Sequence, residues 1–106
     1  MAVDNVELHP EALEEALAAY AYYLENSIRA ADRFFAELGR AFDRILEVPA
    51  SWPPYLHRTR HFILTDYPYS VVYKESGKQV IVYAVAHGKR KPGYWRKRLG
   101  WNPPFA

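Results

Sequence analysis

The sequence contains no cysteine. That absence excludes a disulfide framework, a thiolate metal site and a cysteine nucleophile. No apolar run approaches the roughly 18 residues that a membrane-spanning helix needs, so no membrane association is expected. The N-terminal residues MAVDNVELHP lack the basic start and the apolar stretch of a secretory signal peptide. We therefore expect a soluble protein of the cytoplasm.

Motifs of the common enzyme classes are also missing. The chain has no GxSxG nucleophile motif, no phosphate-binding P-loop and no dinucleotide-binding glycine pattern. Acidic residues are scarce in the second half, where Asp66 lies in an expected turn, so a two-carboxylate or two-metal site is not expected. A zinc site of His57, His61 and His87 is not expected, because His57 and His61 would share a strand face but lie too far apart to bind one ion together. We expect neither a metal nor a small-molecule cofactor.

Charge is distributed unevenly along the chain. Residues 1–56 carry ten acidic and four basic side chains, a formal charge of −6. Residues 57–106 carry ten basic and two acidic side chains, a formal charge of +8. The formal net charge of +2 therefore hides a strongly basic second half, which indicates a polyanionic partner.

The first half reads as two helices after a short strand. A length of 106 residues suits one domain, and residues 6–8 suit a first strand. Pro10 fits a helical first turn, and apolar residues with helical spacing follow as a stripe through Leu13, Leu17 and Leu24. Ser27 is a good cap for a second helix, which Pro49 ends. So short a connection predicts an antiparallel helical hairpin.

The second half changes to the alternation of strands. After an irregular connector around Trp52, alternating segments follow at residues 58–64 and 69–74, and residues 79–87 form an almost wholly apolar run. Such a run is typical of a central strand covered on both faces. The sequence thus predicts an α+β fold: a short N-terminal strand and a helical hairpin packed on a small, mainly antiparallel sheet of three to four strands.

The stretch HGKRKPGYWRKR, residues 87–98, follows that central strand and holds the main functional candidates. We expect Arg60, His87, Arg90 and Tyr94 to converge on one open face of the sheet. Two arginines can hold a phosphate, and a histidine can transfer a proton near neutral pH. Nucleic-acid contacts are expected from the basic side chains and the second aromatic residue of the region: Arg58, Lys89, Lys91, Trp95, Arg96, Lys97 and Arg98.

These groups suffice for RNA cleavage without a metal. The ribose 2′-hydroxyl would attack the adjacent phosphate while the catalytic candidates neutralise charge and shuttle protons. Simpler interpretations stay open: Arg60 can decorate an exposed strand, His87 can be a structural histidine, and the basic tail can serve solubility.

Several segments together resemble the RelE/ParE superfamily of toxins from type II toxin–antitoxin systems, also called plasmid stabilisation proteins. The similarity covers nearly the whole chain and is sharpest in DYPYSVVYK and VYAVAHGKRKPGYWRKR. RelE-like members cut mRNA on the ribosome, and there Arg90 and Tyr94 would match the arginine and the tyrosine that follow the central strand. Such members often carry an arginine at the position of Ser70, and lysines in the preceding strand.

The resemblance implies a growth-inhibiting toxin with a cognate antitoxin as its partner. A ribosome-dependent mRNA endonuclease would act on the ribosome and mRNA. ParE-like members instead inhibit DNA gyrase and have no nuclease site, and a non-toxic binding member is a third alternative. The sequence leaves these alternatives open.

Overall fold

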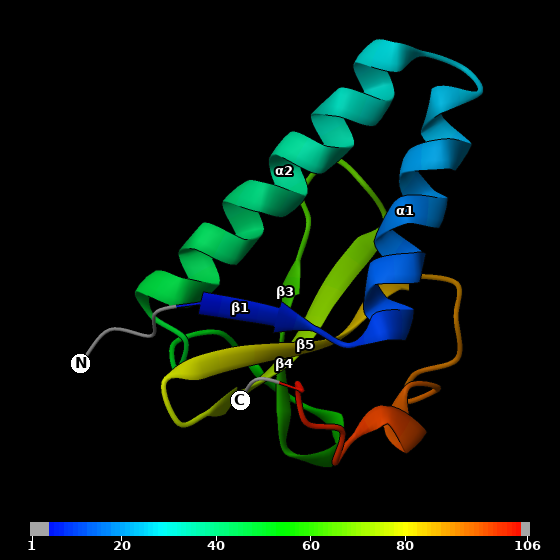
Figure 1. The fold of residues 1–106 in the computed structure, drawn as a ribbon. Coiled ribbons are helices and arrows are strands. Elements are labelled where there is room, and N and C mark those ends of the chain that lie inside the picture. Colours follow the sequence, from blue (N-terminus) through cyan, green and yellow to red (C-terminus); the bar gives the residue numbers. More distant parts are fainter. Residues whose placement is uncertain (1–4, 105–106) are drawn as a thin grey trace.

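The computed structural model describes residues 5–104. Its helices are α1 (Pro10–Leu24) and α2 (Ile28–Glu47), and its strands are β1 (Asn5–Leu8), β2 (Pro54–Tyr55), β3 (Thr59–Ile63), β4 (Tyr69–Ser76) and β5 (Gln79–His87). The five strands form one sheet in the order β1-β5-β4-β3-β2. β1 runs parallel to β5, and the other neighbours are antiparallel. Figure 1 shows the two helices as an antiparallel pair on one face of this sheet.

The expected α+β fold is confirmed, but the sheet has five strands and not three to four. The additional strand is β2, which lies in the segment expected to be an irregular connector. It comprises two residues, with Pro54 paired to Arg60 and Tyr55 paired to Thr59. So short a strand has no alternating pattern of its own, and only its pairing with β3 defines it.

Local sequence explains where each helix begins. Pro10 occupies the first turn of α1, and the Nδ1 atom of His9 accepts a hydrogen bond from the backbone N–H of Glu11 at 3.0 Å. The Ser27 hydroxyl caps α2 by accepting from the N–H of Ala30 at 3.2 Å. Both caps satisfy N–H groups that have no partner within the helix.

The buried face of α1 differs from the expected leucine stripe. Ala12, Ala16 and Ala19 face the sheet, whereas Leu13 and Leu17 are about half exposed, at 49% and 50%. Small side chains let the helix approach the sheet closely. The leucines are thereby displaced toward the groove between the two helices, where Phe35 of α2 also lies.

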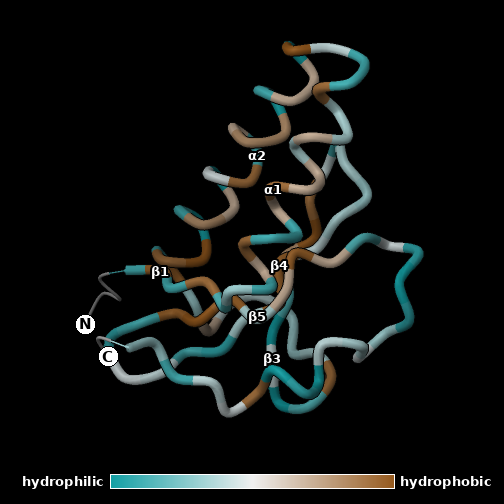
Figure 2. Tube along the Cα trace, turned by 45° about the vertical axis from the view of Figure 1, so that its right-hand side comes forward, coloured by the Kyte–Doolittle hydropathy of each residue, from teal (hydrophilic) through white to brown (hydrophobic). Residues whose placement is uncertain are grey.

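The main core fills the space between helices and sheet. α2 contributes Phe34, Leu38 and Ile45, and the sheet contributes side chains such as Val71 and Val82. Figure 2 shows hydrophobic and hydrophilic positions alternating along α2, as expected of a helix with one buried face. As expected for a strand covered on both faces, residues 80–85 of β5 are all buried.

A second, smaller core lies on the opposite face of the sheet. It forms because residues 88–103, here called the strap, fold back beneath β4 and β5 after β5 ends. Trp95 of the strap packs on Val72 of β4 and Ala84 of β5. The basic C-terminal segment is therefore part of the packed fold.

Candidate functional site

Arg60 lies away from the other three residues expected to form a catalytic group. In the sheet Arg60 is paired with Tyr73, whereas His87 is paired with Tyr69. Tyr69 and Tyr73 are four residues apart along β4, which corresponds to about 13 Å at the usual rise of a strand. The guanidinium of Arg60 instead donates to the Trp52 carbonyl at 2.6 Å. Arg60 therefore does not converge with His87, Arg90 and Tyr94 as expected, because the register of the strands sets its distance from His87.

His87, Arg90 and Tyr94 do come together where β5 passes into the strap. The backbone turns immediately after His87, as the Arg90 N–H donates to the His87 carbonyl at 3.0 Å. The guanidinium of Arg90 then lies 3.7 Å from the centre of the Tyr94 ring, a cation–π contact.

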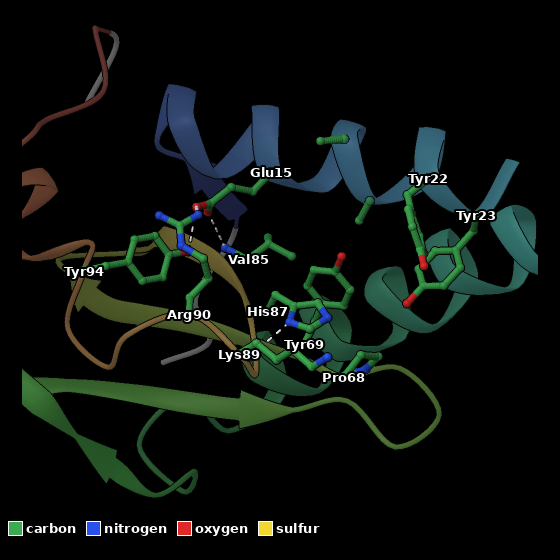
Figure 3. Close-up of a pocket in the computed structure, with 12 residues that line it drawn as sticks. Glu15, Tyr22, Tyr23, Pro68, Tyr69, Val85, His87, Lys89, Arg90 and Tyr94 are labelled. Carbon is green, nitrogen blue, oxygen red and sulfur yellow. Dashed lines mark hydrogen bonds and ion pairs between the residues drawn. The ribbon is translucent and has the colours of Figure 1, made fainter. Parts of the chain in front are cut away.

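These three residues line a cavity of about 550 Å³ between α1 and the end of the β4–β5 pair. Four tyrosines contribute to its wall, and we call it the tyrosine pocket. Figure 3 shows Tyr22 and Tyr23 at one end, Arg90 and Tyr94 at the other, and His87 with Lys89 between them. The lining residues are Glu15, Ala18, Ala19, Tyr22, Tyr23, Pro68, Tyr69, Val85, His87, Lys89, Arg90 and Tyr94.

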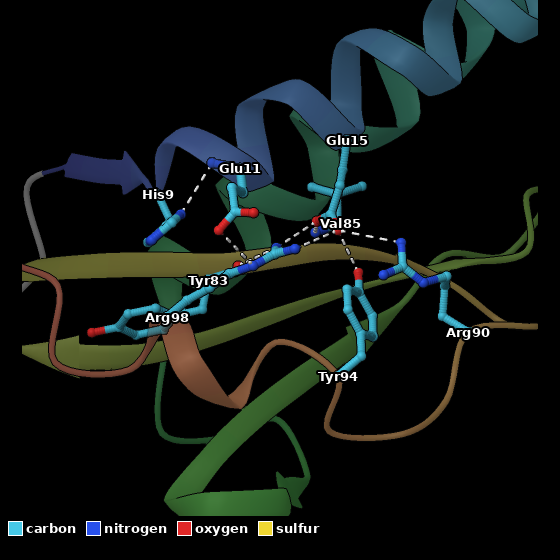
Figure 4. Close-up of polar contacts among 8 residues, drawn as sticks. All are labelled: His9, Glu11, Glu15, Tyr83, Val85, Arg90, Tyr94 and Arg98. Carbon is cyan, nitrogen blue, oxygen red and sulfur yellow. Dashed lines mark hydrogen bonds and ion pairs between the residues drawn. The ribbon is translucent and has the colours of Figure 1, made fainter.

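Glu15 of α1, which is not among the predicted site residues, connects the pocket to the strap. Its carboxylate accepts two hydrogen bonds from the Arg98 guanidinium, at 2.9 and 3.0 Å. It also accepts from the Tyr94 hydroxyl at 2.6 Å and from the Val85 N–H at 3.0 Å. Figure 4 shows these donors converging on Glu15. The carboxylate thus ties together α1, β5 and the strap.

One sequence signal is consistent with this contact. Glu11 and Glu15 are four residues apart and so lie on the same face of the helix. Both contact Arg98, since the Arg98 Nε atom is 3.5 Å from a Glu11 carboxylate oxygen. The pair of glutamates predicts that a cation binds to this face of the helix. It does not identify Arg98 as that cation, because Arg98 lies 83 residues after Glu15 in the sequence.

The Glu15 contacts change the interpretation of Arg98. Its side chain is only 10% exposed, and one nitrogen also donates to the Tyr83 carbonyl at 2.9 Å. Burial acts to lower the pKa of Arg98, but the hydrogen bonds and charge of Glu15 outweigh burial and raise it. Arg98 therefore holds the strap in place and is not presented to a nucleic acid as expected.

Tyr94 is restrained in the same way. Burial, followed by the hydrogen bond to Glu15, raises the pKa of the Tyr94 hydroxyl well above its usual value of 10. A proton held this strongly by a carboxylate is poorly suited to acid–base catalysis near neutral pH.

Trp95 was expected to stack on a nucleic-acid base, but it is only 1% exposed. Its ring fills the second core against Val72 and Ala84, with Tyr55 also packed there. An indole so completely enclosed has no open face for a ligand. The expectation for Trp95 is therefore corrected: the residue is structural.

The remaining basic candidates are exposed on the surface. Lys89, Lys91, Arg96 and Lys97 project from the strap, and Arg58 is the last residue of the 3₁₀ turn before β3. Arg58 has a φ of 65°, so its side chain leaves the backbone in an unusual direction. All five side chains are exposed, as the charge pattern suggests.

A second, smaller hollow lies on the strap side of the sheet. It measures about 170 Å³ and brings Ser70, Arg90 and Tyr94 together. Its wall includes His61, whose ring stacks on Tyr55 with the ring centres 4.0 Å apart and the planes at 9°. Burial lowers the pKa of His61, so it is a neutral, packed side chain near pH 7. RelE-like enzymes often place an arginine where this hollow has Ser70.

Within residues 5–104, no three side chains of histidine, aspartate or glutamate lie close enough to hold a metal ion. Over the same range, neither helix is long and apolar enough to cross a membrane.

Comparison with known proteins identifies one family. Residues 6–92 match the family model of the ParE toxin of the type II toxin–antitoxin system parDE. Among solved structures, a chain of the chromosomal ParDE system from P. aeruginosa superposes with a TM-score of 0.69 and 16% sequence identity. That match covers 80% of this chain and 96% of the other. A search of curated proteins gives no match.

Proposed function

Because the chain belongs to the ParE family of type II toxins, we propose that it inhibits growth by binding a protein target, with DNA gyrase as the candidate, and not by cutting RNA. One observation carries this proposal. The groups expected to form a nuclease site are separated or engaged elsewhere: Arg60 binds the Trp52 carbonyl, and Tyr94 donates to Glu15.

The neighbourhood of Ser70 supports the same proposal. A metal-independent RNA cleavage site needs several cations around the reacting phosphate. The strap-side hollow is lined by Arg90 and Lys91, but it has Ser70 at the position where RelE-like enzymes often carry an arginine, and His61 is packed against Tyr55. The hollow therefore lacks one of the cations that such enzymes often place beside the reacting phosphate.

The exposed side of the strap supports binding to a macromolecule. Lys91, Arg96 and Lys97 are exposed there, while Trp95 and Arg98 fix the backbone that carries them. A basic surface on a rigid backbone increases the rate of association with an acidic partner and loses little entropy on binding.

A cognate antitoxin is the partner implied by membership of a type II toxin family. The basic second half of the chain suits an antitoxin with an acidic toxin-binding segment. Co-expression with the neighbouring small reading frame should then neutralise toxicity and give a complex that survives purification.

Ribosome-dependent mRNA cleavage is the second candidate. It is favoured by the position of His87, which lines both the tyrosine pocket and the strap-side hollow beside Arg90. A histidine beside an arginine at an open edge is a reasonable proton-transfer group. This alternative predicts that His87→Ala or Arg90→Ala abolishes both growth arrest and mRNA cleavage.

Two assays on the same preparation distinguish the candidates. Purified protein is added to gyrase in a supercoiling assay and to a translation extract in which mRNA is mapped by primer extension. Inhibited supercoiling with intact mRNA supports the proposal, whereas cleaved mRNA with normal supercoiling refutes it. Normal growth on induction, with neither effect in vitro, identifies a non-toxic binding member and also refutes it.

Charge variants test the contact surface. The double change Arg96→Gln with Lys97→Gln should weaken gyrase inhibition by about tenfold, because each lost surface charge is worth up to about 1 kcal/mol. The matched control is Lys78→Gln, an exposed lysine in the β4–β5 turn, which should inhibit like the original protein. Equal inhibition by all three proteins would remove the strap from the contact.

A further inference from the structure

The tyrosine pocket is not used by the proposed function. It opens on the helix side of the sheet, whereas the strap-side hollow lies on the opposite face. Its volume of about 550 Å³ is within the range of sites for small ligands, roughly 300–1,000 Å³.

The floor of the pocket presents hydrogen-bond donors. The Nδ1 atom of His87 accepts from the Lys89 N–H at 3.0 Å, so in the neutral imidazole the proton resides on Nε2. His87 can thus donate to a ligand through Nε2, and Lys89 lines the same pocket with a cationic side chain. An anion would satisfy both groups.

Arg90 supplies a second cation because Glu15 is already neutralised. The Glu15 carboxylate receives two hydrogen bonds from Arg98, whereas its nearest approach to Arg90 is 4.0 Å. Arg90 is held instead by stacking on the Tyr94 ring, and its side chain remains 53% exposed. Its planar guanidinium can therefore bind a phosphate through two nitrogens.

The other end of the pocket is aromatic. Tyr22 and Tyr23 of α1 are edge-on to each other with ring centres 5.3 Å apart, and Tyr23 is fixed in the same way on Tyr67 at 4.8 Å. Tyr22 is 60% exposed, and Tyr69 adds a further ring between the two ends. An open tyrosine ring is a surface on which a planar base stacks, typically with about 1–3 kcal/mol.

We propose that the tyrosine pocket binds a nucleoside phosphate, with the phosphate at Lys89 and Arg90 and the base on Tyr22. Donors at one end and an open aromatic ring at the other match the two parts of such a ligand. The ligand can be a free nucleotide or the end of a nucleic-acid strand, since both present the same groups. An acidic peptide would use the cations but has no planar base for the tyrosines.

Calorimetric titration of the purified protein tests this pocket without any toxin target. The probes are AMP, adenosine, inorganic phosphate, a 5′-phosphorylated oligonucleotide and a hexaglutamate peptide. We expect saturable one-site binding of AMP, with adenosine and inorganic phosphate each weaker by at least about tenfold, because each lacks one of the two contacts. A failure of the gyrase proposal would leave this titration unaffected.

Two pocket variants and two controls locate the site. Arg90→Gln and Tyr22→Ala should each weaken AMP binding by about tenfold or more, by losing the charged and the stacked contact respectively. Lys78→Gln removes an exposed charge outside the pocket, and Tyr20→Ala removes a tyrosine that packs on Phe35 instead. Both controls should bind AMP like the original protein.

The outcomes are distinct. Oligonucleotide binding that is lost in Tyr22→Ala, with weaker binding of free AMP, supports the proposal and identifies a strand end as the source of the ligand. Binding of hexaglutamate but not of either nucleotide probe would overturn it in favour of an acidic peptide. No nucleotide binding at about 1 mM, or equal losses in pocket and control variants, would also overturn it.

Discussion

Replacing Glu15 with glutamine removes the charge to which the strap is fixed. Arg98 would then lie 10% exposed without a full counter-charge, and the Tyr94 hydroxyl would lose a carboxylate acceptor. Removing one partner of a buried ion pair costs about 3–5 kcal/mol. Because the glutamine oxygen still accepts one hydrogen bond and the Glu15 side chain is 16% exposed, we expect a loss of about 2–4 kcal/mol.

Equilibrium unfolding in urea, followed by tryptophan fluorescence, measures this loss. In a protein of this size each kcal/mol lowers the melting temperature by about 4–8 °C, so the Glu15→Gln variant should melt at least about 8 °C lower. The matched control is Glu14→Gln, an exposed glutamate one position earlier in α1, which should change stability by less than about 0.5 kcal/mol.

A double-mutant cycle isolates the contact itself. Arg98→Met alone should destabilise, and combined with Glu15→Gln it should cost clearly less than the sum of the single changes, because the two side chains share one interaction. If Glu15→Gln unfolds like Glu14→Gln, or if the two losses are additive, the strap is not held by this pair and the reasoning is refuted.

Three further results are expected. Trp95→Ala should lower the free energy of unfolding by about 3–5 kcal/mol in urea titrations, and a loss below 1 kcal/mol would contradict its burial. Gly93→Ala should cost about 1–2 kcal/mol in the same assay, since the residue has a φ of 82°; an unchanged midpoint would argue against that conformation. Burial, and then the charge of Arg98, lower the pKa of His9 from 6.5, so its contribution to stability is present above pH 6.5 and is lost as the pH falls through the folded-state pKa. His9→Asn keeps a cap for α1 and should reduce the loss of stability between pH 7.5 and 5, whereas an unchanged loss would exclude His9 as its source.

The candidate site was only partly predictable, as three residues illustrate. The turn after β5 places Arg90 and His87 in one pocket, as short sequence separation suggests. Arg60 was misplaced because its distance from His87 depends on the register of two strand pairs, which the alternating pattern does not specify. Glu15 was overlooked because its partners lie at positions 85, 94 and 98.

For the basic segment after β5, the sequence predicts exposed cations but not the burial of Trp95 and Arg98. Its composition predicts exposed cations, and Lys91 and Lys97 are exposed. It cannot show that Trp95 and Arg98 point inward, since an aromatic residue among basic ones fits a binding surface and a packed strap equally well. The packed strap forms because the apolar side chains of Val72 and Ala84, on the face of the sheet opposite the helices, are removed from water when Trp95 covers them.

By itself the sequence determined both helices and the strands other than β2, in their order. Periodicity, a proline and a serine cap specify α1 and α2, and alternating or continuous apolar segments specify β3, β4 and β5, because these preferences act between residues a few positions apart. Tertiary structure alone decided that Ala12 and not Leu13 faces the sheet, that Glu15 binds Arg98, and that a tyrosine pocket forms. Those outcomes depend on how whole elements pack, and packing brings together residues that no local pattern connects.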